Sequence, residues 1–300
     1  MRIPSFSYSN SLINQMHKLN GQQIKAQTQL ATGQRISSAE EDPRAAGRAL
    51  NTLTEKSRIQ AQNTSLKHAN TIAEFTMASY EQLKVLSNES SRLANNSDGL
   101  TSSSDYRARA LQIDQLLEQS LRILNTKLGE DYVFAGANTA ERPYVESRDG
   151  DGRIISVDYT GTSDPNQDVS IRIGEGANIA PYSKGAINAE IGEWVNHLVA
   201  LRDALEAEDL DAVNALAPEM ESADETILIN LVEFGSIQQS MDITQKINTA
   251  RFNELERMAS SELDLDIAES IVRLNQMQTA YSAALQSSSR ILQQSILNYI

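Results

Sequence analysis

The sequence contains no cysteine, and only 5% of its 300 residues are aromatic, with a single tryptophan, Trp194. The absence of cysteine excludes a disulfide framework and a thiolate metal site. Few aromatic residues among 40% hydrophobic residues indicate an aliphatic core, which is typical of long helices rather than of sandwiches. Basic residues are also scarce, with 26 Lys and Arg against 40 Asp and Glu. The resulting net charge of −14 argues against nucleic acid as a partner.

Other patterns are missing as well. No run of apolar residues approaches the length of a membrane span. The N-terminus, MRIPSFSYSNS, has one basic residue and no apolar core, so we expect no Sec-type signal peptide and another route if the protein is exported. No nucleotide-binding, serine-hydrolase or zinc-protease motif occurs, and His17, His68 and His197 fall on separate predicted helices. We therefore expect no enzymatic activity, no cofactor and no metal.

What the sequence does contain is coiled-coil periodicity at both ends. Residues 263–300 hold no Pro or Gly, and their apolar residues recur at the a and d spacing of a coiled-coil seam. A second helix with this spacing is expected from about Ser11 to Gly33, a residue suited to ending a helix. A lone helix buries almost none of its seam, so each end needs a partner helix. The pattern leaves open a bundle within the chain, pairing of the two ends, and assembly with other subunits.

We predict that the two terminal seams form an assembly interface. The predicted interface residues are Leu12, Met16, Leu19, Leu30, Ile267, Ile271, Leu274, Tyr281, Leu285 and Leu292.

Between the ends, helical patterns flank a segment of different composition. Asp42 is a natural N-cap and Pro43 a natural first helical residue, so a long helix should begin there and run to about residue 95. Further helices are expected over 106–128, 187–207 and 219–259, with a short helix ending before Pro218. Residues 137–186 instead combine three prolines with alternating apolar residues, which predicts short strands.

The predicted fold is mainly α with a β-rich insertion, in which both termini form a long-helix bundle or coiled coil. The predicted segments are a coiled-coil segment (1–42), a helical core in two parts (43–136 and 187–260), a β-rich inserted domain (137–186) and a second coiled-coil segment (261–300). The run DGDG at residues 149–152 predicts a hairpin turn rather than a calcium loop, because further oxygen ligands and a terminal Glu in register are absent.

Several segments of the sequence resemble a known protein family. LATGQRISSAEEDPRAAGRAL (residues 30–50) and the C-terminal run from residue 264 resemble the two terminal signatures of the flagellin superfamily. DYVFAGANTAERPY (131–144) and VDYTGTSDPNQDVSIRIGEG (157–176) resemble its hook–filament junction branch more than its flagellins. VEFGSIQQSMD (232–242) also fits, although Ser236-Ile237 replaces the usual small residue followed by Arg. The resemblance covers nearly the whole chain.

The resemblance implies nested, flagellin-like domains and a structural role in the bacterial flagellum, at the junction between hook and flagellin filament. It implies four kinds of partner: copies of itself, the adjacent hook-side junction protein, flagellin, and a cytoplasmic export chaperone. It also implies an extracellular location reached through the flagellar type III apparatus. A short flagellin and a non-flagellar coiled-coil adaptor are the alternatives, and membrane-surface binding by a terminal helix is disfavoured by the few Lys and Arg there.

Overall fold

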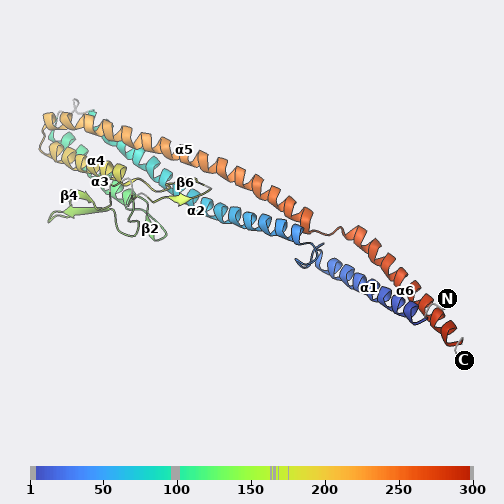
Figure 1. Ribbon diagram of the computed structural model, residues 1–300. Coiled ribbons are helices and arrows are strands. Elements are labelled where there is room, and N and C mark those ends of the chain that lie inside the picture. The colour runs from blue at the N-terminus through green and yellow to red at the C-terminus, as the bar shows by residue number, and fades with distance from the viewer. Residues whose placement is uncertain are drawn as a thin grey trace. The chain divides into compact units, whose positions relative to one another are not determined.

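The computed structural model describes residues 5–95, 102–162, 164, 167, 169–174 and 176–297, although not the side chains of residues 5–9, 12 and 291–297. It is mainly α-helical with a small β component, as the sequence predicts. The chain forms two compact units (Figure 1). The terminal unit comprises Met1–Arg58 with Ala250–Ile300, and the central unit comprises Ile59–Thr249.

The terminal unit pairs the two ends of the chain. Helix α1 (Ser5–Thr32) lies beside α6 (Ile267–Leu297), and the first turns of α2 (Pro43–Asn95) belong to the same unit as the last turns of α5 (Leu210–Leu263). Helix α1 ends directly before Gly33, whose φ of +70° favours glycine, and α2 begins at the predicted Pro43. The carboxylate of Asp42 accepts from the Ala45 amide at 3.0 Å, which confirms Asp42 as the N-cap.

The central unit packs α3 (Ser103–Leu124) against α4 (Gly185–Glu206), with the remaining parts of α2 and α5 completing a helical core. Trp194, Tyr80 and Phe134 are at most 1% exposed in that core. The Tyr80 ring lies 5.4 Å from the ring of Phe134 and 5.4 Å from that of Phe234, so side chains from three separate segments meet there.

Helix boundaries differ from the prediction at two places. The helix expected over 106–128 is α3, which spans Ser103–Leu124, and residues 127–128 form a strand instead. The sequence places a break at Pro218, whereas α5 is continuous from Leu210 to Leu263 with Pro218 inside it. A proline removes one helical hydrogen bond and crowds the preceding turn. Val213 and Met220, on either side of Pro218, are fully buried in the core, and that burial favours continuing the helix through the proline.

The strands form three antiparallel pairs. Strand β1 (Lys127–Leu128) pairs with β2 (Asp131–Tyr132), β3 (Tyr144–Arg148) with β4 (Ile154–Tyr159), and β5 (Ile171–Arg172) with β6 (Asn178–Ile179).

The DGDG run is the turn between β3 and β4, as predicted, and the Asp149 carboxylate accepts from the amides of Asp151 and Arg153. The hairpin does not have a separate core. Its inward residues Tyr144, Ile154 and Val157 are at most 2% exposed and belong to the same cluster as Trp194. The five predicted segments remain a prediction. Along the chain, the boundaries of the two compact units fall after Arg58 in α2 and before Ala250 in α5.

Candidate assembly interface

The two terminal helices pack along one face of each. On α1 that face consists of half-buried or buried residues at steps of 3 and 4, namely Met16, Leu19, Gln23, Ala26 and Leu30. On α6 the corresponding face consists of Ser270, Leu274, Met277, Tyr281, Ala284 and Ser288. Both sets follow the heptad spacing of a coiled-coil seam. The hydroxyl of Ser288 donates to the thioether sulfur of Met16 at 3.6 Å, so the seam joins residues 272 positions apart.

The structure divides the predicted interface residues into two groups. Met16, Leu19, Leu30, Leu274 and Tyr281 are half-buried and lie on the paired faces. Ile267, Ile271 and Leu285 are exposed by 56%, 47% and 43%, because the α6 seam runs through Ser270, Ala284 and Ser288 rather than through the larger residues beside them. The side chains of Leu12 and Leu292 lie outside the described residues. Participation of all ten in assembly remains a prediction.

The paired helices α1 and α6 expose a set of large apolar side chains, among them Ile267, Ile271 and Leu285. Besides these three residues, Ile13, Ile24 and Val272 of the same helix pair are exposed by 51–56%. Fully burying one such side chain stabilises a structure by about 1.5–3 kcal/mol. A pair of helices can bury only one face of each, so the paired termini still carry apolar surface that further helices would cover.

A joint separates each terminal helix from its neighbour. Residues 33–42 connect α1 to α2, and residues 264–266 connect α5 to α6. The two connections meet in a short antiparallel bridge between Gln34 and Asp264. The Arg35 amide donates to the Leu263 carbonyl at 2.7 Å, and the Leu265 amide donates to the Gly33 carbonyl at 3.0 Å. The two breaks between helices therefore lie side by side and are joined by backbone hydrogen bonds.

Charged side chains reinforce the joint. The Arg35 guanidinium donates to the Glu262 carbonyl at 2.7 Å, and Arg48 forms a bidentate ion pair with the Glu262 carboxylate. The hydrogen bond from Arg48 lowers the pKa of Glu262 below its ordinary value of 4.5. On the other side of the loop, the Ser37 amide donates to Glu41 at 3.0 Å and lowers the pKa of that carboxyl. The joint thus contains ionised carboxylates at neutral pH.

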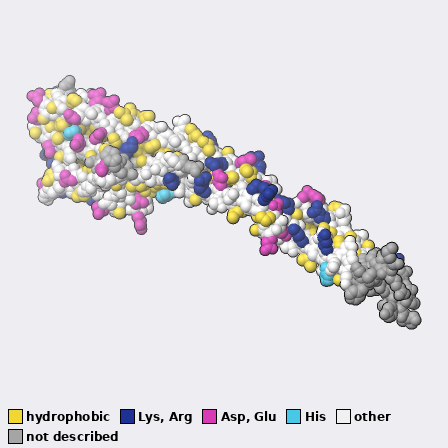
Figure 2. Space-filling model, in the orientation of Figure 1, with side chains coloured by type: hydrophobic (Ala, Val, Ile, Leu, Met, Phe, Trp, Pro, Cys, Tyr) yellow, Lys and Arg dark blue, Asp and Glu magenta, His cyan; other side chains and the backbone are white. Residues whose placement is uncertain are grey.

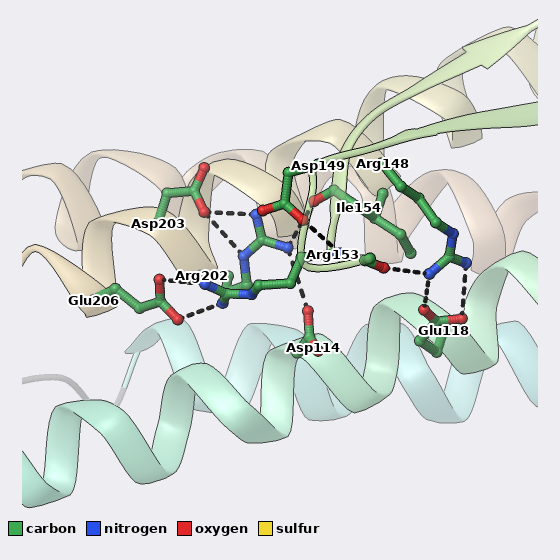
Figure 3. A network of polar contacts seen from close by, with 10 residues as sticks. Asp114, Glu118, Arg148, Asp149, Arg153, Ile154, Arg202, Asp203 and Glu206 are labelled. Atoms are coloured by element: carbon green, nitrogen blue, oxygen red, sulfur yellow. Dashed lines mark hydrogen bonds and ion pairs between the residues drawn. The ribbon is translucent and has the colours of Figure 1, made fainter.

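A second polar network fixes the β3–β4 hairpin within the central unit (Figure 3). Arg202 of α4 is 2% exposed and donates to the Ile154 carbonyl at 2.7 Å and to Asp114 of α3 at 3.2 Å. At the hairpin turn, Arg153 forms a bidentate pair with Glu206 of α4.

Arg148 forms a similar pair with Glu118 of α3, and the hydrogen bonds from Arg148 lower the pKa of Glu118. The hairpin is therefore tied to both helices beneath it. Sequence reasoning missed this network, because its partners, apart from the neighbours Arg202 and Asp203, are 30 to 88 residues apart and none forms a motif.

The described residues contain no group of three or more His, Asp or Glu side chains placed to hold a metal ion. Within the same ranges, no helix combines the length and the apolar character needed to cross a bilayer. Chemically, the arrangement offers packing surfaces and ion pairs.

The fold is that of the flagellar hook-associated proteins. A solved structure from Vibrio parahaemolyticus, described as flagellar hook-associated, matches 75% of this chain and 100% of its own chain with a TM-score of 0.65 at 15% identity. The structure of Bacillus cereus FlgL matches 70% of this chain and 99% of its own with a TM-score of 0.58 at 18% identity. At such identities the likeness establishes the fold.

A particular protein also matches in sequence. The chain is similar to flagellar hook-associated protein 3 of Escherichia coli (strain K12), with 30% identity over 131 residues. These residues are 42% of this chain and 40% of that protein, so the match spans less than half of the relative's length. No protein-family model matches the chain. These matches confirm the predicted resemblance to flagellar hook-associated protein 3.

Proposed function

We propose that this chain is a structural protein of the bacterial flagellum that forms the junction between the hook and the flagellin filament. Its role would be structural rather than catalytic. It would assemble through its terminal helices, which offer apolar surface to further subunits.

The observation that carries this proposal is the pairing of α1 with α6. The pair buries one seam and leaves Ile267, Ile271 and Leu285 exposed on the same helix. Scattered apolar residues on a surface need no explanation, but aligned ones along a helix that already has one partner indicate a second partner. The fold shared with hook-associated proteins supports a flagellar setting for that second partner.

The proposal includes the partners. Copies of this chain would contact each other, the hook-side junction protein would lie on one side, and flagellin would lie on the other. Before assembly, the chain would be carried by a cytoplasmic export chaperone and leave the cell through the flagellar type III apparatus. Because two different surfaces meet in such contacts, the assembly would be heterologous and would close into a ring when the rotation per subunit permits.

Locating the protein in isolated hook–filament preparations tests the proposal. Gold-labelled antibody should mark a single band where hook meets filament, and cells without the gene should secrete flagellin yet build no filaments. Labelling along the whole filament would instead identify a short flagellin. Absence from the preparations would favour a soluble coiled-coil adaptor and overturn the proposal.

A further inference from the structure

Helix α5 carries apolar residues on two opposite faces. The inner face packs into the core of the central unit through Ile227, Phe234 and Met241, which recur every seven residues and are at most 4% exposed. This face accounts for the position of α5 in the fold.

The opposite face forms an outer stripe of four residues, Ile229, Val232, Ile243 and Ile247. They are exposed by 58%, 65%, 52% and 60%, respectively. Ser236 and Gln239 complete the steps of 3 and 4 between Val232 and Ile243, so the outer stripe follows heptad spacing across about four to five turns of helix. Hydrophobic side chains appear along the edge that α5 forms in Figure 1 (Figure 2). A helix with apolar residues on two faces generally packs on both.

The charges around the outer stripe restrict its partner. Residues 210–245 of α5 contain seven Asp and Glu and no Lys or Arg. Glu225 and Asp242 are exposed next to the stripe. The whole central unit has 30 acidic and 14 basic residues, a net charge of −16. Such a surface repels an anionic membrane and a second copy of itself, and it favours a partner surface that is both apolar and basic.

The terminal unit of the same chain offers that surface. It has 12 basic and 10 acidic residues in all. Residues 43–58 of α2 contain four basic residues and one acidic residue, and they expose Leu50 by 66% and Leu53 by 43%. Arg48 and Lys56 pair with Glu262 and Glu256 of α5, so Arg44 and Arg58 are the basic side chains of this stretch that a partner surface would meet. Arg44 and Arg58, six residues before Leu50 and eight residues after it, are also exposed, and a Cβ added at Gly47 would meet no atom within 4 Å. Basic side chains gather over this stretch in Figure 2.

We propose that the outer stripe of one copy packs on residues 43–58 of the next copy. The inference rests on the proposed function, since it names the surfaces by which copies of the chain meet. The two surfaces differ in charge and lie on different units, so each added copy leaves one of each available. The contact is therefore heterologous and continues from subunit to subunit.

A photo-cross-linking amino acid in place of Val232 tests the contact in the purified full-length chain. Irradiation followed by peptide mapping should find adducts between residue 232 and residues 43–58 of another copy. Val85 provides a matched control, because it is a valine of the central unit with a similar exposure of 67%. The same probe at position 85 should give no adduct with residues 43–58.

Charge reversal then tests the proposed complementarity. Arg44→Glu with Arg58→Glu should lower the adduct yield about tenfold or more, because like charges replace opposite ones. Mixing this variant with a probe-bearing chain that carries Glu225→Lys and Asp242→Lys should restore the adduct. A control with Arg107→Glu and Arg122→Glu on α3 makes the same charge change elsewhere and should not lower the yield. The variants with reversed charge should melt like the parent protein.

The inference is overturned if the probe at position 232 gives no adduct between copies, if it cross-links to another region, or if charge reversal at Arg44 and Arg58 leaves the yield unchanged. These outcomes are separable from failure of the proposed function, because the measurement uses purified protein. A junction protein could still label the hook–filament boundary while using other surfaces, and a protein absent from flagella could still show the cross-link.

Discussion

The guanidinium of Arg48 donates to both carboxylate oxygens of Glu262, at 2.8 and 2.9 Å, across 214 positions of sequence. This pair joins the start of α2 to the end of α5 within the terminal unit. It lies beside the bridge between Gln34 and Asp264, where the chain leaves α1 on one side and enters α6 on the other. The α1–α2 connection and the α5–α6 connection are therefore held together by contacts that involve both segments of the chain.

The first prediction concerns the charge on Glu262. Because Arg48 lowers the pKa of Glu262 in the folded state, Arg48→Gln should raise it toward 4.5. Any stability that the pair contributes is present above the unfolded pKa and is lost as the pH falls through the folded one. An NMR titration of the Glu262 carboxyl measures this directly. Arg44→Gln is the control, and equal titration curves in the two variants would contradict the role given to Arg48.

A second prediction concerns the seam between α1 and α6. Ala26 is 5% exposed on the paired face of α1. Ala26→Glu would place a long charged side chain there, so the helices should separate. Hydrogen exchange in residues 10–32 should accelerate, while exchange in the core around Trp194 stays unchanged. Gln27→Glu adds the same side chain at the next, exposed position and should leave exchange unaltered. Equal protection in both variants would show that the seam does not order these helices.

A third prediction concerns the hairpin of the central unit. Arg202→Met should leave the buried carbonyl of Ile154 without its donor, at a cost of about 1–3 kcal/mol. At about 2–4 °C per kcal/mol for a unit of this size, the melting temperature should fall by several degrees. Arg153→Met removes an exposed pair and should cost less than about 1 kcal/mol. Calorimetry of the two variants compares them, and equal melting temperatures would argue against the role of Arg202.

The sequence predicts local features of the helices well. Asp42 and Pro43 mark the start of α2 because capping depends on residues next to the helix end, and Gly33 marks the end of α1 for a similar reason. Pro218 misleads, since its local cost competes with the burial of distant side chains such as Val213. A local signal cannot report the strength of tertiary packing.

The candidate interface was predictable only in part. The α1 seam contains large apolar residues at its heptad positions, so Met16, Leu19 and Leu30 were found. On α6 the paired face includes the small residues Ser270, Ala284 and Ser288. The heptad pattern of the sequence instead assigns the larger Ile267 and Ile271 to the seam, because large apolar residues are favoured at heptad positions. The outer stripe of α5 was not predicted from the sequence. Apolar residues on two opposite faces of one helix remove the contrast between an apolar and a polar face from which the buried face is read.

We propose that the exposed apolar line of α6, Ile267, Ile271 and Leu285, is an assembly interface of the flagellum. The double change Ile271→Glu with Leu285→Glu alters two residues that are 47% and 43% exposed in the monomer, so each change should shift the free energy of unfolding by under about 0.5 kcal/mol. In an assembled junction the same carboxylates would be buried against a neighbouring helix, at a cost of several kcal/mol. Asn275→Glu with Gln286→Glu is the matched control, because it adds two charges on α6 without removing an apolar side chain.

The deciding measurement is filament formation in cells that carry each variant as their only copy, with the melting temperature of each purified protein measured in parallel. We predict that the Ile271→Glu, Leu285→Glu protein melts like the parent while its cells secrete flagellin and build no filaments, and that the control cells are motile. Normal filaments in the cells with the Ile271→Glu, Leu285→Glu protein would show that this line of α6 is not an assembly interface.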